Sequence, residues 1–168
     1  MFKAVRVLLA SVFAVMIFSG IAAAEEKLAY VDLSKTFSEY KKTKDYDKIL
    51  NDKTSAYESE REKKVNEVKQ FQDKLNLLSD KEKQGKMPEL EEKVKALQEF
   101  DRQRQTDLRK EQDEKMKEIL KDIEDTVKLY AEKEGYSLVF NDRVLIYQKS
   151  NMNITDPIIA ILNKGYKK

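Results

Sequence analysis

Neighbouring acidic side chains, such as Glu91-Glu92, Asp113-Glu114 and Glu124-Asp125, are the residues of this sequence that could do acid–base chemistry. Two carboxyl groups divide the roles of acid and base only when their surroundings move their pKa values apart. These pairs lie in highly charged stretches typical of solvent-exposed helices, where such tuning is not expected. The chain has no histidine and no cysteine. Ser-His and Cys-His nucleophiles, thiolate metal sites and disulfides are therefore excluded, and the sequence predicts neither an enzyme nor a cofactor.

Residues 41–134 carry the composition of long helices, because Lys, Glu, Asp, Gln and Leu dominate and only Gly85 and Pro88 interrupt them. Apolar residues recur at helical spacing in both halves and form one thin stripe in each. Several positions along the stripe are charged instead, namely Arg61, Lys64, Asp101, Arg104 and Glu111. A tight coiled-coil seam would bury those charges at a cost. We therefore expect exposed arms that touch one another intermittently.

A turn is expected at residues 79–88, where Gly85 can adopt a positive φ and Pro88 suits the first turn of a new helix. The two predicted helices, from Ser34 or Lys35 to Leu78 and from Pro88 to Glu134, would form an antiparallel hairpin of matched arms, each about 65 Å long. The region around the tip is locally basic. The lysines concerned are Lys74, Lys81, Lys83 and Lys86.

The two ends of the hairpin meet, so the flanking segments 25–40 and 135–168 are expected to form one small β-rich body. Residues 27–33 read as a strand, and residues 136–140 and 144–147 read as a C-terminal hairpin after a helix-ending Gly135. A final helix follows, capped at Thr155 or Asp156 with Pro157 in its first turn. The alternative for residues 153–155, a glycosylation acceptor, is a pattern that also arises by chance.

The predicted strands are apolar on both faces, which one small body cannot cover alone. Other copies of the chain are therefore expected to supply the missing surface. The residues assigned to oligomerisation are Tyr30, Val31, Leu138, Val139, Phe140 and Ile146.

The first residues read as a secretory signal, with Lys3 and Arg6 before the apolar run 7–21 and a cleavage site at Ala22-Ala23-Ala24. An uncleaved membrane anchor over residues 7–24 is the alternative. Cleavage removes two of the 33 basic residues and none of the 31 acidic ones, so the mature chain is neutral. A neutral chain lacks the cationic excess of a nucleic-acid-binding protein.

Three segments taken together resemble the Skp/OmpH family of periplasmic chaperones: residues 28–40 (LAYVDLSKTFSEY), 134–140 (EGYSLVF) and 153–159 (NITDPII). The resemblance implies a mostly helical α+β fold in a homotrimer. Strands from three subunits would form a β-barrel body, and helical hairpins would surround a cavity. It also implies ATP-independent capture of unfolded outer-membrane proteins in the periplasm.

The chain departs from the family in two respects. Its neutral mature charge argues against electrostatic capture of acidic clients or of lipopolysaccharide. Lys41 follows Tyr40 where many relatives have proline, so we expect the first helix to continue smoothly into the arm.

The leading hypothesis is a holdase that retains unfolded clients through many weak contacts. Aromatic and methionine residues of the arms are either ordinary stripe residues or client contacts: Tyr57, Phe71, Met87, Phe100 and Met116. The alternatives are a structural coiled coil that bridges cell-envelope components and, third, a membrane-anchored adaptor. A bridging coiled coil should keep its a and d positions apolar, which these arms do not do.

Overall fold

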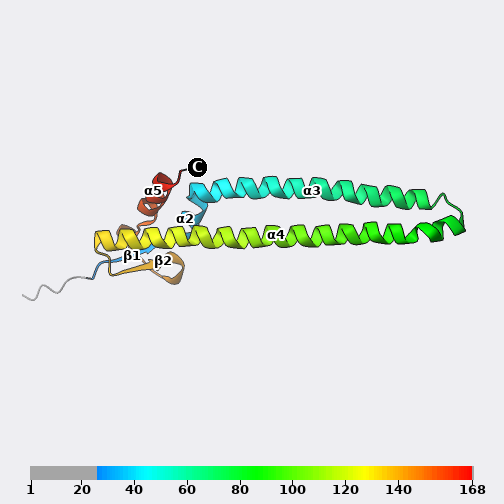
Figure 1. Ribbon diagram of the computed structural model, residues 1–168. Helices are drawn as coiled ribbons and strands as arrows, with labels where there is room; N and C mark the ends of the chain where they lie inside the picture. The colour runs from blue at the N-terminus through cyan, green and yellow to red at the C-terminus, as the bar shows by residue number, and fades with distance from the viewer. Residues whose placement is uncertain (1–25, 168) are drawn as a thin grey trace, which may run out of the picture.

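The computed structural model describes residues 26–167, so the expected signal peptide at residues 1–24 lies outside the described residues. Two long antiparallel helices extend from a small body of short helices and strands (Figure 1). The expected mostly helical α+β fold with a small sheet is confirmed. Within the described part of the chain, no helix combines the length and apolar character needed to cross a membrane.

The sheet of the body is formed by β1 (Leu28–Val31) and β2 (Leu138–Asn141), which pair in parallel with Leu28 opposite Leu138. On its other edge β1 contacts the segment before the last helix, since the Ile154 N–H donates to the Tyr30 carbonyl over 3.0 Å. Strand β1 thus lies in the middle, between β2 on one edge and the segment before α5 on the other.

The first helical segment is broken where the sequence predicted continuity. Helix α2 (Leu33–Glu39) begins after Asp32, whose side chain accepts the Lys35 N–H over 2.8 Å, and helix α3 begins anew and spans Lys41–Leu75. Between them Tyr40 has φ −67° and ψ 126°, which is an extended conformation. The expectation of one smooth helix from Ser34 to Leu78 is wrong, because contacts from distant parts of the chain hold Tyr40 in this conformation.

The turn at the arm tip is shorter than predicted and occupies residues 76–79, because helix α4 spans Asp80–Glu134 and includes Gly85 and Pro88. Glu82 explains the early start of α4, since its carboxylate accepts the N–H of Ser79 over 3.2 Å. With 35 residues in α3 and 55 in α4, the helices are not matched in length. Gly135 ends α4 as expected, with φ +74°.

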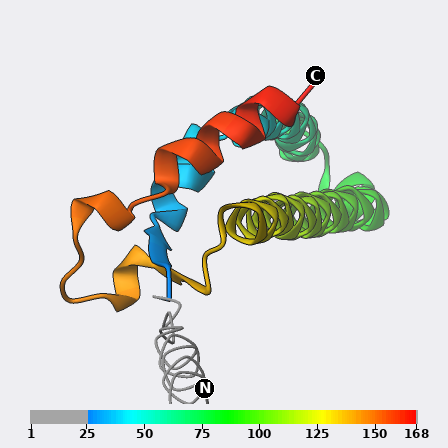
Figure 2. The ribbon, with the colours of Figure 1, turned by 90° about the vertical axis from the view of Figure 1, so that its left-hand side faces the viewer.

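The predicted strand at residues 144–147 is not formed. After β2 the chain enters a 3-10 turn at Asp142–Val144, where the Asn141 side chain accepts the Arg143 N–H, and residues 145–149 stay irregular. Figure 2 shows this segment looping away from α5 and the sheet. Within residues 26–167 no strand pairs with residues 144–147, since β2 pairs only with β1 and the 3-10 turn directs the chain away from the free edge of β2 (Figure 2).

Helix α5 (Thr155–Gly165) begins where predicted and carries Pro157 in its first turn. The predicted capping by Thr155 is wrong, however. Its hydroxyl accepts the Asp32 N–H over 2.9 Å, and the Asn153 side chain accepts the N–H of Thr155 over 2.8 Å. Thr155 therefore connects α5 to the end of β1.

The hydrophobic core lies in the body and draws on every part of it. Its buried members are Ala29, Val31, Tyr40, Ile119, Ile123, Ile154, Ile158 and Leu162. Two of these come from α4, so the long helix of the arm also serves as a wall of the body. Between residues 44 and 115 only Leu75 is buried. The arm is thus stabilised by other means than a hydrophobic core.

Candidate functional site

Polar contacts hold the arm together, beginning where α3 leaves the body at Lys42. Its ammonium group lies 2.7 Å from a carboxylate oxygen of Glu118 and 2.6 Å from one of Asp122, both on α4. The Tyr40 hydroxyl also donates to Asp122, over 3.2 Å. No sequence pattern indicates this cluster, because its members are about 80 residues apart.

These contacts stabilise the ordinary charge states of the groups involved. Hydrogen bonds from Lys115 and Lys42 lower the pKa of Glu118 to about 2. Burial, followed by the charge of Asp122, raises the pKa of Tyr40 to about 12. Burial opposes the charge of Lys42, but its hydrogen bonds to Asp122 and Glu118 raise its pKa above the usual value. None of these groups is poised to exchange protons at neutral pH, so the cluster is structural.

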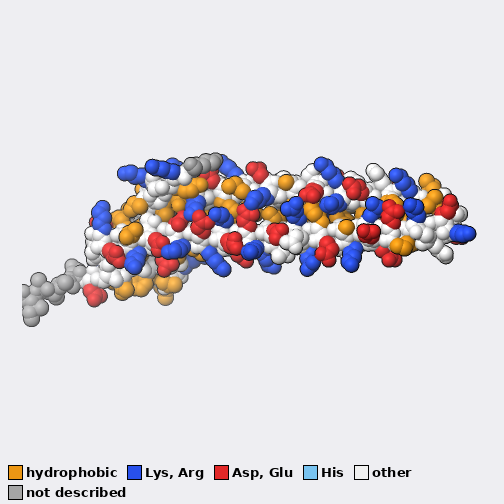
Figure 3. Space-filling view, viewed as in Figure 1, with side chains coloured by type: hydrophobic (Ala, Val, Ile, Leu, Met, Phe, Trp, Pro, Cys, Tyr) orange, Lys and Arg blue, Asp and Glu red, His pale blue; other side chains and the backbone are white. Residues whose placement is uncertain are grey.

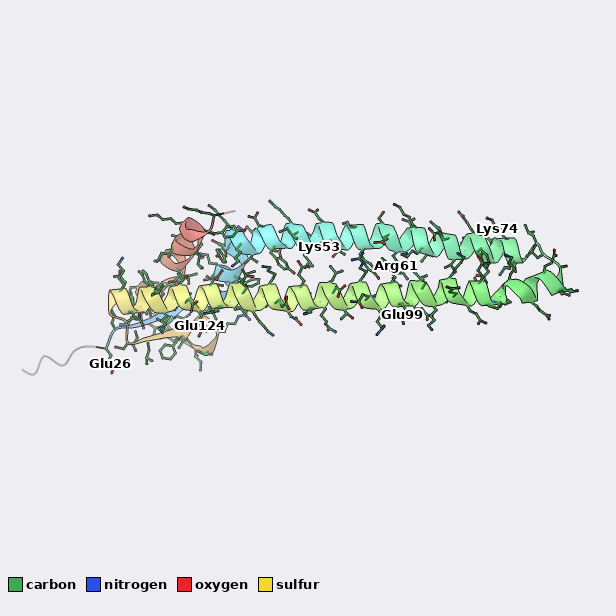
Figure 4. All side chains as sticks on the ribbon, viewed as in Figure 1. Glu26, Lys53, Arg61, Lys74, Glu99 and Glu124 are labelled. Carbon is green, nitrogen blue, oxygen red and sulfur yellow. The ribbon has the colours of Figure 1, made fainter. Side chains whose placement is uncertain are left out.

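Farther along the arm, charged residues of the predicted stripe form ion pairs across the hairpin. Arg61 lies 3.0 Å from Asp101, and Lys53 lies 2.5 Å from Glu111. Figure 4 shows Lys53 and Arg61 directed from α3 toward α4. Arg104 approaches Glu60 at 3.5 Å. The prediction that charged residues interrupt the apolar stripe is confirmed. The structure shows in addition that Arg61, Arg104 and Glu111 form ion pairs with residues of the opposite helix.

The aromatic residues of the middle arm take part in the same contact. The rings of Tyr57 and Phe100 lie 5.8 Å apart, and the Tyr57 hydroxyl donates to Asp101 over 3.1 Å. Lys64 lies over the Phe100 ring at 5.1 Å and Lys93 over the Phe71 ring at 5.4 Å. A cavity of about 260 Å³ remains between the helices beside Tyr57.

The five residues considered as client contacts therefore fall into two groups. Tyr57, Phe71 and Phe100 are partly buried in the contact between the two arm helices. Met87 near the tip and Met116 near the body are exposed. The exposed pair is available to a partner in this conformation, whereas the aromatic residues would become available only if the helices separated.

The basic residues of the tip lie on both sides of the turn, with Lys74 in the last turn of α3 and the others at the beginning of α4. Acidic neighbours offset part of their charge, as in the 3.3 Å contact between Lys86 and Glu89. The tip also exposes apolar side chains that the sequence analysis did not single out, of which Leu77 is 87% exposed.

The body presents an apolar face around β2. Leu138 is 52% exposed, Phe140 is partly exposed, and Ile146 is fully exposed. Val144 and Tyr147 extend this face, which we call the β2 face and which appears as hydrophobic surface beside β2 in Figure 3. The alternation along β2 puts Val139 on the opposite side, against the core.

Two residues that were assigned to oligomerisation are covered by the chain itself. Tyr30 is 7% exposed and Val31 is 3% exposed, and Val31 belongs to the core. Val139 packs against the core as well, so Leu138, Phe140 and Ile146 remain the assigned residues with substantial free surface. Over residues 26–167 the structure brings together no group of His, Cys, Asp and Glu that could hold a metal ion.

The protein consists of a small β body and one long helical hairpin that extends from it as an arm, so the fold is not that of a compact domain. A family model described as outer membrane protein (OmpH-like) matches residues 27–162. The chain is 28% identical to the chaperone protein Skp of Photorhabdus luminescens over 146 residues, which cover 84% of this chain and 88% of that protein.

A crystal structure gives the same result for the fold. The protein it shows, described as an OmpH-like outer membrane chaperone of Caulobacter crescentus, superposes with a TM-score of 0.78, at 14% identity and over 90% of this chain and 92% of that one. The chain belongs to the OmpH-like family. The expected family is confirmed, and membership agrees with the expectation that the chain is not an enzyme.

Proposed function

We propose that this protein is a periplasmic holdase chaperone, which captures unfolded outer-membrane proteins between helical arms and prevents their aggregation without ATP. The observation that carries the proposal is the almost coreless arm, in which Leu75 is the only buried residue between positions 44 and 115. Charged and half-exposed apolar side chains alternate over its whole length (Figure 3). The related chaperone of P. luminescens supports the same class of activity.

Such a surface suits weak binding at many points. Each exposed side chain, such as Met87 or Met116, offers a small apolar contact, and many simultaneous contacts give retention with easy release. A client without fixed structure can satisfy these contacts in many arrangements, so no single pocket is needed. ATP independence agrees with the isolated glycines of the sequence, which form no phosphate-binding loop.

A cavity requires more than one arm, and the β2 face supports assembly. Leu138, Phe140 and Ile146 leave apolar surface on one side of the body, and monomeric soluble proteins rarely expose such contiguous patches. The free edge of β2 and the irregular segment 145–149 offer backbone groups to a neighbour. We infer a homotrimer with a shared β-barrel body, in which three arms surround the client.

The alternative function, a coiled coil bridging envelope components, fits the arm less well. A bridging helix pair specifies its partner through a continuous apolar seam, and here ion pairs such as Arg61 with Asp101 occupy the seam. The neutral mature charge also argues against lipopolysaccharide as a main ligand, since no net field attracts an anionic surface.

Dilution of an unfolded outer-membrane β-barrel protein from urea tests the proposal directly. Light scattering is followed with and without the mature protein, and without nucleotide. The proposal predicts suppression of scattering at near-stoichiometric ratios. Scattering that is unchanged at an excess of the protein would contradict the holdase function.

A further inference from the structure

The break between α2 and α3 has no cause in its own sequence. Residues 33–45 contain neither glycine nor proline, and good helix formers surround Tyr40. Tyr40 nevertheless has an extended backbone with ψ 126°. In Figure 1, α2 leaves the start of α3 at a steep angle and runs toward α4. Contacts from elsewhere in the chain must therefore stabilise the break.

Asn163 of α5 supplies those contacts. A continuous helix would pair the Lys41 N–H with Phe37 and the Glu39 carbonyl with Thr43, and the break removes both hydrogen bonds. The Asn163 side chain replaces them, since its Oδ1 accepts the Lys41 N–H over 2.7 Å and its Nδ2 donates to the Glu39 carbonyl over 3.1 Å. One side chain thus satisfies a donor and an acceptor that the break leaves free.

Two further contacts hold the residue at the break. The Tyr40 side chain is 5% exposed. Its ring and the Tyr166 ring meet edge to face with centroids 5.8 Å apart, and its hydroxyl donates to Asp122 of α4 over 3.2 Å. Tyr166 follows directly after α5, so the ring contact and the Asn163 hydrogen bonds come from one end of one helix. The end of α5 therefore contacts both the backbone and the side chain of the break.

The break lies in only one of the two connections between arm and body. Helix α4 runs uninterrupted from the tip into the core, where Ile119 and Ile123 are buried, whereas the connection through α3 is interrupted at Tyr40. If the arm moves, the interrupted connection is the one that can change its angle most easily.

We propose that Asn163 is a positioning residue for the arm: its side chain fixes the α2–α3 break and thereby sets where α3 lies relative to the body. Without this side chain, Tyr40 and the ion pairs of Lys42 with Glu118 and Asp122 are left to hold the beginning of α3, and α3 then samples a wider range of positions. The consequence for clients rests on the proposed holdase function, because a looser arm changes the width of the cavity. The effect on arm position does not depend on that function.

A rescue variant follows from the geometry of the break. Proline is favoured at the first position of a helix, which Lys41 occupies in α3, and it restricts the preceding residue to ψ of about 120–160°. The ψ of Tyr40 already lies in that range. Lys41→Pro should therefore fix the break through the backbone alone, without any hydrogen bond from Asn163.

Spin-label distances in the full mature protein test the proposal. The chain has no cysteine, so labels at Ser59→Cys on α3 and Glu132→Cys on α4 report the position of α3 alone. Labelled chains are diluted with unlabelled ones to suppress distances between copies. A second pair, Arg109→Cys with Glu132→Cys, lies within α4 and serves as the internal control.

We expect Asn163→Ala to broaden the α3–α4 distance distribution at least twofold and to leave the distance within α4 unchanged. The double variant Asn163→Ala with Lys41→Pro should show the narrow distribution again. The exposed Asn151→Ala is the matched control and should change nothing. A distribution that Asn163→Ala leaves narrow overturns the proposal. The proposal is also overturned if Lys41→Pro does not reverse the broadening of the distance distribution, since the cause would then be general loosening of α5. Neither result bears on the aggregation assay.

Discussion

Ile146→Asp should dissociate the assembly while leaving the single chain folded. The Ile146 side chain is fully exposed in the isolated chain and makes no contribution to the hydrophobic core. A charge at this position therefore costs a monomer almost nothing. Any large effect of the substitution must come from a neighbouring copy that covers the β2 face.

The size of that effect follows from burial. Removing one isoleucine side chain from an interface costs about 2 kcal/mol, and leaving an unpaired carboxylate there costs at least ~2 kcal/mol more. Each contact between copies is then weakened by about 4 kcal/mol, which corresponds to roughly a thousandfold in the dissociation constant. Assemblies stable at micromolar concentration should become monomers.

Size-exclusion chromatography with light scattering measures the assembly, and circular dichroism measures the helix content of the same samples. Leu77→Asp is the matched control, because Leu77 is also apolar and highly exposed but lies at the arm tip. We expect monomers for Ile146→Asp and unchanged assembly for Leu77→Asp. An Ile146→Asp protein that keeps the oligomeric state of the wild type would refute the assignment of the β2 face.

Three further predictions concern stability and flexibility. Ile158→Ala removes a fully buried core side chain and should lower the free energy of unfolding by about 2–5 kcal/mol in chemical denaturation; a loss below ~1 kcal/mol would contradict the position of the core. Glu118 has a pKa lowered from 4.5 to about 2, so the stability it contributes is present above pH 4.5 and is lost as the pH falls through about 2. The Tm difference between wild type and Glu118→Gln should be small, because Glu118 is half-exposed. This difference should shrink as the pH falls from 4.5 to about 2. A Tm difference that grows on acidification would contradict the ion pair between Lys42 and Glu118. Amide hydrogen exchange should be fast in residues 74–95 and slow in β1, and equally slow exchange along the arm would contradict a pliable arm.

The sequence predicted the elements whose determinants are local. The composition of residues 41–134 predicted two long helices, Gly135 predicted the end of the second, and the apolar run at residues 136–140 predicted β2. The expected helix start at Pro88 is wrong although a local signal exists, because Ser79 followed by Glu82 already marks the start of α4. Proline within a helix loses one backbone hydrogen bond, and α4 tolerates that loss.

Features that depend on distant partners could not be predicted. The break at Tyr40 requires Asn163, which lies more than 120 residues away in the sequence. The charges of the arm stripe were recognised, but the partner of Arg61 is 40 residues away and depends on the register of the hairpin. The segment 144–147 has the composition of a strand, yet it pairs with no strand of the described residues, because the 3-10 turn at residues 142–144 directs it away from β2.

The central claim is that arms assembled around a common body hold the client, and the activity of an assembly-deficient protein tests it most directly. Aggregation of a urea-diluted outer-membrane β-barrel protein is measured by light scattering with equal subunit concentrations of wild type, Ile146→Asp and Gln98→Asp, a control charge on the exposed surface of the arm. We predict that Ile146→Asp is monomeric and loses most of its suppression of aggregation, while Gln98→Asp keeps the wild-type activity. A monomeric Ile146→Asp protein that suppresses aggregation as fully as the wild type would show that no cavity between arms is needed.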